Sequence, residues 1–133
     1  MKFSGMLKDN TLKGKVILIT GGGTGLGKSM GAYFMELGAN LIITSRKQEV
    51  LDKTAGEFSK YTGEVFPITG DVRDHKDVKN VIDKSLEQFG KIDCLLNNAA
   101  GNFISPTERL TPKAFDVVVD IVLKGTYNFS LLI

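Results

Sequence analysis

A glycine-rich stretch at residues 20–27 has the composition and spacing of a phosphate-binding loop. Its sequence is Thr20-Gly21-Gly22-Gly23-Thr24-Gly25-Leu26-Gly27, and it follows the apolar run 16–19. Because glycine lacks a Cβ, backbone N–H groups in such a loop can approach an anion, which the N-terminus of the following helix also attracts. The spacing fits neither a P-loop, which closes on Gly-Lys-Ser/Thr, nor the Gly-x-Gly-x-x-Gly pattern. We therefore predict a phosphate site; the alternative, a glycine-rich hairpin, is disfavoured by the helical pattern that follows.

Two cations stand where a second strand is expected to end. The sequence there is Ser45-Arg46-Lys47, after the apolar run 41–44. Domains that bind NAD carry Asp or Glu at this place, which accepts hydrogen bonds from the adenosine ribose. An acidic residue would repel a 2′-phosphate, whereas Arg46 can pair with one through two hydrogen bonds. We therefore predict NADP as the ligand, and two solvated surface cations are the alternative.

Two further loops carry polar or small residues at expected strand ends. Asp71 follows the third strand, where it can accept a hydrogen bond from the adenine amino group with Val72 against the ring. An aspartate that merely orders its loop is the alternative. After the fourth strand, the small residues of the stretch 97–103 would let the nicotinamide ribose lie on the backbone, although such residues are also common in ordinary turns. Its adjacent asparagines, Asn97 and Asn98, need partners and could tie this loop to its neighbours.

The elements that must position these loops alternate along the chain. We expect strands at 16–20, 41–44, 64–68 and 92–96, separated by helices over about 25–37, 50–58 and 75–89, with a last helix from Thr111-Pro112 to the end. This alternation predicts an α/β fold, a Rossmann-type doubly wound parallel sheet of four strands in the order 3-2-1-4. Ligands bind outside the carboxyl ends of such strands, where all four loops begin.

Apolar spacing predicts which side chains the core buries. The expected buried stripe of the first helix is Leu26, Met30, Phe34 and Leu37, and that of the third is Val78, Val81, Ile82, Leu86 and Phe89. The end signals are an N-cap at Asp74 and a left-handed glycine at Gly38. Cys94 lies in an apolar run, so we predict a buried, inert thiol.

Bulk composition narrows the classes of protein. With 133 residues and 42% hydrophobic content, the chain suits one domain with a core. A formal charge of +2 disfavours nucleic acid or an anionic membrane as partner. One cysteine excludes an internal disulfide and fits a cytoplasmic setting. We expect no metal site, no signal peptide in residues 1–10 and no membrane span, which needs about 20 apolar residues.

Taken together, these motifs resemble those of the short-chain dehydrogenase/reductase family. The matching positions are Thr20-Gly21-x-x-x-Gly25-x-Gly27, then Asp71-Val72, then Asn98-Ala99-x-Gly101, in register over essentially the whole chain. Within that family, the stretch 97–112, the stretch 120–126 and Ser45-Arg46-Lys47 are similar to the 2,4-dienoyl-CoA reductases, which use NADPH.

The resemblance implies roles for particular residues. The pyrophosphate would be wrapped by Gly21, Gly22, Gly23, Thr24, Gly25 and Leu26. Arg46 would bind the 2′-phosphate, and Asp71 would bind the adenine. Asn98 and Ala99 would contact the cofactor's ribose. The other predicted cofactor-binding residues are Ser45, Val72 and Ala100. The acyl-CoA site would be lined by Arg73, Phe103 and Thr111. Asn102 would be the catalytic hydrogen-bond donor to the thioester oxygen.

The resemblance also implies a reaction. Ketone-reducing members of the family carry asparagine at the position of Val122, and valine can neither donate nor accept a proton there. Dienoyl-CoA reductases resemble this chain in that substitution. Hydride from NADPH would add to the far end of the conjugated diene, the negative charge would move to the thioester oxygen, and protonation near the carbonyl would leave a 3-enoyl-CoA.

Two alternatives stay open at this level. One is a short-chain reductase of 3-oxoacyl thioesters or other ketones, and the other is a nucleotide-binding module without catalysis. The apolar end, Leu131-Leu132-Ile133, leads us to expect that residues 1–133 are the cofactor-binding half of a longer enzyme. The resemblance implies that the second half supplies the catalytic tyrosine and lysine, and that the intact protein is a homo-oligomer, a tetramer.

Overall fold

The computed structural model describes residues 6–133, and its elements alternate as the sequence predicts. The strands are β1 (Val16–Thr20), β2 (Asn40–Ser45), β3 (Val65–Thr69) and β4 (Cys94–Leu96). The helices are α1 (Gly25–Glu36), α2 (Gln48–Phe58), α3 (His75–Phe89), the 3₁₀ turn η1 (Thr107–Arg109), α4 (Pro112–Val119), the π-helical segment η2 (Asp120–Lys124) and α5 (Gly125–Leu132). The irregular lead-in predicted for residues 1–13 falls outside the described residues at positions 1–5; positions 6–13 form bends and turns.

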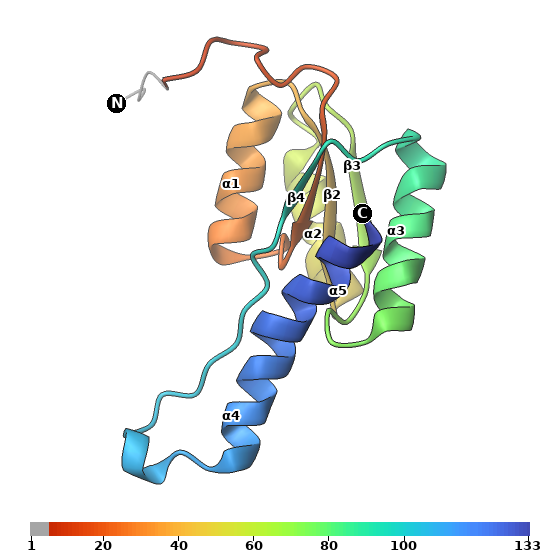
Figure 1. Ribbon diagram of the computed structural model, residues 1–133. Coiled ribbons are helices and arrows are strands. Elements are labelled where there is room, and N and C mark those ends of the chain that lie inside the picture. The colour runs from red at the N-terminus through yellow and green to blue at the C-terminus, as the bar shows by residue number, and fades with distance from the viewer. Residues whose placement is uncertain (1–5) are drawn as a thin grey trace.

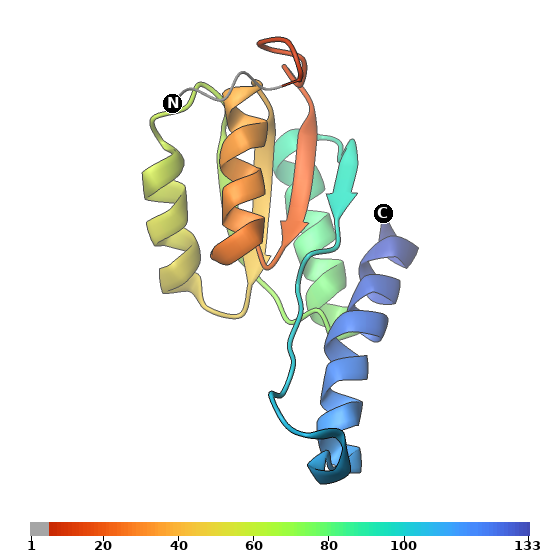
Figure 2. The same cartoon turned by 90° about the vertical axis from the view of Figure 1, so that its left-hand side faces the viewer.

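The four strands form one parallel sheet in the order β3-β2-β1-β4, which confirms the predicted strand order. Helices α1 and α2 cover one face, and α3 and α5 cover the other (Figures 1 and 2). Because alternate residues of a strand point to opposite faces, β1 contributes to both cores. Its Ile17 and Ile19 pack with α1 and α2, whereas Val16 and Leu18 pack with α3 and α5. This double cover explains the unbroken apolar runs of β1 and β2.

The predicted helix ends are confirmed. Asp74 caps α3 by accepting hydrogen bonds from the backbone N–H groups of Lys76 and Asp77. Thr111 caps α4 by accepting from the N–H of Ala114. Gly38, just after α1, has a φ of +92°, in the left-handed region that favours glycine.

The predicted apolar stripe of α1 is wrong in part. Leu37 is buried, but Leu26 is 77% exposed. The buried residues within α1 are Gly27, Gly31 and Met35. Small residues face the sheet because the helix packs closely on it: a Cβ on Gly31 would lie 3.1 Å from Leu41 Cδ1. Hydrophobic spacing alone favours large side chains and therefore misplaced this contact face.

Two other burial predictions are also corrected. Cys94 is exposed, because β4 is an edge strand whose one neighbour in the sheet is β1. Leu86 is 42% exposed, whereas Val78, Val81 and Ile82 of the same stripe are buried as predicted. Position at the edge of the sheet, and not the type of side chain, explains the exposure of Cys94.

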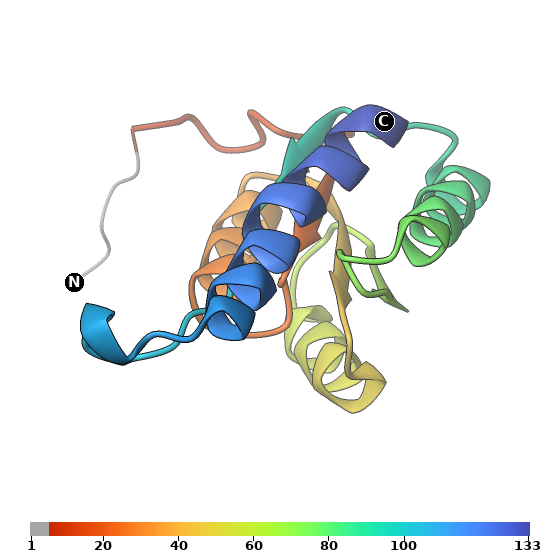
Figure 3. The ribbon, with the colours of Figure 1, turned by 60° about the horizontal axis from the view of Figure 1, so that its bottom comes forward.

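The last helix runs through a π-helical segment. The sequence predicts one helix after Pro112, and Figure 3 shows α4, η2 and α5 as one continuous rod. In η2 the backbone widens to i→i+5 hydrogen bonding over Asp120–Lys124. Such segments are frequent at functional sites. No helix over residues 6–133 is long and apolar enough to cross a membrane.

Candidate functional site

The loops that follow the four strands meet around one pocket of about 420 Å³. A volume of this size is within the range of ligand sites. It is lined by eleven of the predicted cofactor-binding residues: Gly21, Thr24, Gly25, Leu26, Ser45, Arg46, Asp71, Val72, Asn98, Ala99 and Ala100. Arg73 lines it as well, together with two residues that the sequence reasoning missed, Gly70 and Ile121.

The remaining predicted site residues lie elsewhere. Gly22 and Gly23 are buried behind the pocket wall, where a Cβ would lie 2.8 Å from Ile43 Cγ2 and 3.0 Å from Val50 Cγ1, respectively. They support the loop from behind. Asn102, Phe103 and Thr111 are exposed and lie outside the pocket lining, in the segment that extends beyond the sheet (Figure 1).

The glycine loop is shaped to bring backbone to the pocket. Gly21 and Gly25 have φ values of +67° and +53°, which L-residues with side chains rarely adopt. The loop is fixed from outside, because the Thr54 hydroxyl donates a hydrogen bond of 2.8 Å to the Gly23 carbonyl. The loop backbone is therefore held in place before any ligand arrives.

The N-terminus of α1 is open to an anion. Its N-cap residue, Thr24, makes no side-chain capping hydrogen bond, and the first turn holds no acidic residue. The first N–H groups of a helix have no intrahelical partner, and the helix dipole adds partial positive charge there. Thr24 and Gly25 line the pocket at this end. The residues present therefore fit a phosphate group.

Hydrogen bonds tie the loop after β4 to the glycine loop, as the paired asparagines predict. Thr20 Oγ1 accepts from the backbone N–H groups of Asn98 and Ala99, both at 3.0 Å. In return, Asn98 Nδ2 donates to the carbonyls of Thr20 and Gly21, at 3.0 and 3.3 Å. Asn97 Nδ2 contacts Ser130 Oγ in α5 at 3.2 Å. Two walls of the pocket are thus joined as one unit.

Arg46 faces the pocket without a protein partner among the described residues. It is exposed, and none of the ion pairs within residues 6–133 includes it. The wall also carries Arg73 and Asp71, which pair with each other. Hydrogen bonds from Arg73, helped by the more distant charge of Arg46, hold the pKa of the Asp71 carboxyl below its usual value. Asp71 is therefore an ionised acceptor at neutral pH, and Arg46 is a cation available to an outside anion.

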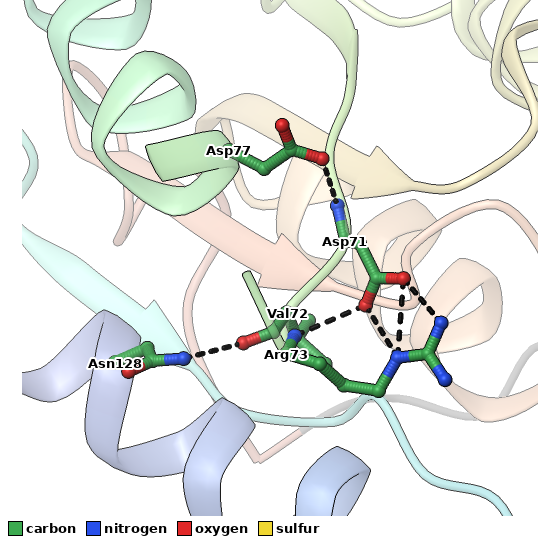
Figure 4. Close-up of polar contacts among 5 residues, drawn as sticks. All are labelled: Asp71, Val72, Arg73, Asp77 and Asn128. Atoms are coloured by element: carbon green, nitrogen blue, oxygen red, sulfur yellow. Dashed lines mark hydrogen bonds and ion pairs between the residues drawn. The ribbon is translucent and has the colours of Figure 1, made fainter. Parts of the chain in front are cut away.

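The loop after β3 is held from several sides (Figure 4). Asp77 Oδ2 accepts from the Asp71 backbone N–H at 3.1 Å. Arg73 Nε donates to Asp71 Oδ1 at 2.9 Å, and the backbone N–H of Arg73 donates to the same oxygen at 3.0 Å. Arg73 thus contacts Asp71 directly, a link that sequence reasoning did not foresee because it assigned the two residues to different ligands.

One glycine of the loop gives a direct test of this close packing. A Cβ on Gly27 would lie 2.5 Å from both Asn98 Nδ2 and the Gly21 carbonyl oxygen, whereas one on Gly56 would have no neighbour within 4 Å. We expect Gly27→Ala to destabilise the protein by about 1–3 kcal/mol through overpacking. Gly56→Ala should stabilise it by about 0.5–1 kcal/mol, because it lowers the entropy of the unfolded chain. Denaturant unfolding measures both, and equal effects would contradict the packing described.

Comparison with a family model identifies the protein family of this chain. Residues 15–133 match the model described as "short chain dehydrogenase". The chain belongs to the short-chain dehydrogenase family. A group of three or more His, Cys, Asp or Glu side chains able to hold a metal ion is absent from residues 6–133, the part of the chain that the structure describes.

Similar proteins carry a more specific name. A Caenorhabditis elegans protein named "Probable 2,4-dienoyl-CoA reductase 3 [(3E)-enoyl-CoA-producing]" is 50% identical over 96% of this chain and 42% of its own length. A Bacillus subtilis protein named as a probable 2,4-dienoyl-CoA reductase, (2E)-enoyl-CoA-producing, is 41% identical over 87% of this chain and 46% of its own. A rat protein named as a peroxisomal 2,4-dienoyl-CoA reductase is 42% identical over 90% of this chain and 41% of its own. The chain thus spans under half the length of these relatives.

A solved structure shares the fold and holds a nicotinamide cofactor. It is 3-ketoacyl-(acyl-carrier-protein) reductase from Brucella melitensis complexed with NADH, which is 32% identical, with a TM-score of 0.83, over 91% of this chain and 49% of that one. Family membership and this neighbour support a nicotinamide nucleotide as the ligand of the pocket.

Proposed function

We propose that this chain is the cofactor-binding half of an NADPH-dependent 2,4-dienoyl-CoA reductase, whose partner is an acyl-CoA substrate. The observation that carries the cofactor choice is Arg46, a pocket cation that forms no ion pair among the described residues and stands where NAD-binding domains place an acid. Support for the substrate class comes from the relatives named as dienoyl-CoA reductases, which are 41–50% identical.

The chain's own residues would orient the cofactor along the pocket. The glycine loop and the N-terminus of α1 would receive the pyrophosphate, and Arg46 the 2′-phosphate. Asp71 would accept from the adenine amino group with Val72 on the ring. Asn98, Ala99 and Ala100 would line the place of the nicotinamide ribose. When bound, the reduced nicotinamide supplies the hydride.

The residues outside the pocket lining would serve the acyl-CoA. Phe103 and Thr111 would line its site together with Arg73, which lines the pocket itself and is hydrogen-bonded to Asp71. Asn102 would donate a hydrogen bond to the thioester oxygen and stabilise the dienolate charge there. Protonation at the α-carbon then gives the 3-enoyl-CoA. The Val122 side chain cannot pass a proton, which disfavours reduction of a ketone to an alcohol.

Substrate choice tests this proposal. We expect the intact protein to oxidise NADPH with a 2,4-dienoyl-CoA at least tenfold faster than with a 3-oxoacyl thioester of the same chain length, since the latter needs a proton relay to its alkoxide. Absorbance of the reduced nicotinamide measures both initial rates. Turnover of the 3-oxoacyl thioester alone would favour the alternative, a ketone reductase; turnover of neither would favour a nucleotide-binding module.

We also propose a homotetramer in the cytoplasm for the intact protein. The exposed apolar side chains on the last helix, among them Phe115, Leu123 and Leu131, support an oligomer, since such patches mark contact surfaces. Light scattering of the intact protein measures its mass, and a monomer would contradict the proposal. Imaging of the tagged protein distinguishes the cytoplasm from the peroxisome, the compartment that the name of the rat relative gives.

A further inference from the structure

A buried side chain of α5 holds the loop that follows β3. Asn128 is 8% exposed, and its Nδ2 donates a hydrogen bond of 2.9 Å to the carbonyl oxygen of Val72. Figure 4 shows this amide pointing from α5 to the loop, on the side away from Asp77. A buried carbonyl without a partner is costly, so the amide fixes the place of the Val72 backbone.

A glycine of the same helix lets α5 approach that loop closely. A Cβ on Gly125 would lie 2.7 Å from Val72 Cγ2 and 2.9 Å from Val72 Cβ. These are distances that real Cβ atoms essentially never show, so any larger residue at 125 would force Val72 and α5 apart. The Val72 side chain is 9% exposed and packs in the core cluster that includes Phe129.

The residues on either side of the held carbonyl face the ligand pocket. Asp71 and Arg73 line it, as does Val72 itself. Asp71 is fixed at its backbone by Asp77 and at its carboxylate by Arg73. Because Val72 lies between Asp71 and Arg73 in the chain, a shift of the Val72 backbone would move both of these side chains relative to the pocket. Among the described residues, neither α3 nor the Asp71–Arg73 pair donates a hydrogen bond to the Val72 carbonyl. Asn128 does so.

We propose that Asn128 and Gly125 are positioning residues for the adenine subsite. They hold Val72 against the ring and keep the Asp71 carboxylate at the depth where it meets the adenine amino group. The inference rests on the proposed function, in which this loop receives the adenine. It assigns to α5, none of whose residues lines the pocket, a role in nucleotide discrimination.

The test compares two cofactors that differ at the adenine amino group. Fluorescence titration of the intact protein gives dissociation constants for NADPH and for reduced nicotinamide hypoxanthine dinucleotide phosphate, which carries a carbonyl in place of the amino group. We expect wild type to prefer NADPH. In Asn128→Ala and in Gly125→Ala, the NADPH dissociation constant should rise about tenfold, the order expected for one lost hydrogen bond. The dissociation constant of the analogue should rise less, so that the preference of each variant for NADPH over the analogue is smaller than that of wild type.

A matched control lies on the same helix. Ser130→Ala removes the contact of Asn97 with α5 and leaves Val72 untouched, so it should keep the wild-type preference. If Asn128 and Gly125 had a merely structural role, their variants would have a lower melting temperature and would bind both nucleotides more weakly by the same factor.

The outcomes separate the two claims. Wild type that binds neither nucleotide would overturn the proposed function, and this inference with it. Wild type that prefers NADPH, with both variants keeping that preference, would overturn the inference alone. Loss of the fold in both variants would also contradict it, because the contact would then belong to the core and not to nucleotide discrimination.

Discussion

Replacing Arg46 by aspartate is expected to lower the NADPH affinity of the intact protein by about 100-fold and to reverse its preference toward NADH. Charge-assisted hydrogen bonds are worth roughly 1.5–3 kcal/mol each, and about 1.4 kcal/mol is a factor of ten in affinity. The substitution removes up to two of them and places a negative charge against the 2′-phosphate. The new carboxylate can instead accept hydrogen bonds from the ribose hydroxyls of NADH.

The measurement is kcat/KM for each nucleotide, in wild type and variant, with the same acyl substrate. Lys47→Asp is the matched control, because it makes the same change of charge one residue further on, at a side chain that does not line the pocket. We expect it to shift the preference by less than a tenth as much. Equal shifts in the two variants would show that only net charge matters, and no shift in either would leave Arg46 as a surface cation.

Removing the amide of Asn102 is expected to lower kcat for a 2,4-dienoyl-CoA by about 100-fold, the order found for loss of one donor to a developing oxyanion. The reason is that charge moves to the thioester oxygen only as hydride adds. A donor that strengthens in the transition state raises kcat, whereas uniform binding changes KM alone. Asn102→Ala should therefore leave the NADPH dissociation constant near the wild-type value.

Steady-state kinetics separate these quantities. Ser105→Ala is the control, since it removes another exposed polar side chain of the same segment, whose hydroxyl donates to the neighbouring Pro106 carbonyl at 3.3 Å. It should keep wild-type kcat. A tenfold rise in KM at constant kcat for Asn102→Ala would place the residue in substrate binding and not in catalysis.

Local patterns were sufficient to predict the frame of the site. Unbroken apolar runs marked β1 and β2 as strands covered on both faces, and right-handed crossovers then determined the order β3-β2-β1-β4. That order alone places the four strand-end loops together. The need of the adjacent asparagines for partners predicted a link from their loop to its neighbours, and the hydrogen bonds of Asn98 to Thr20 and Gly21 show that the glycine loop is one of them.

Features that depend on packing between distant segments could not be predicted in the same way. Glycines in α1 face the sheet because of a close helix–sheet contact that apolar spacing does not encode. Cys94 is exposed because its strand lies at an edge. Ile121 lines the pocket from a π-helical segment, for which the sequence carries no recognised signal. The hydrogen bond from Asn128 to Val72 joins residues 56 positions apart, and no local sequence pattern at either residue predicts it.

The fate of the transferred hydride tests the central claim most directly. The intact protein is incubated with a 2,4-dienoyl-CoA and NADPH that carries deuterium at the transferable position, and the product is analysed by mass spectrometry and NMR. Our account predicts one deuterium at the δ-carbon and a double bond between the β- and γ-carbons. A dienoyl-CoA recovered without deuterium, together with deuterium at the β-carbon of a 3-hydroxyacyl product when a 3-oxoacyl thioester is supplied, would contradict it.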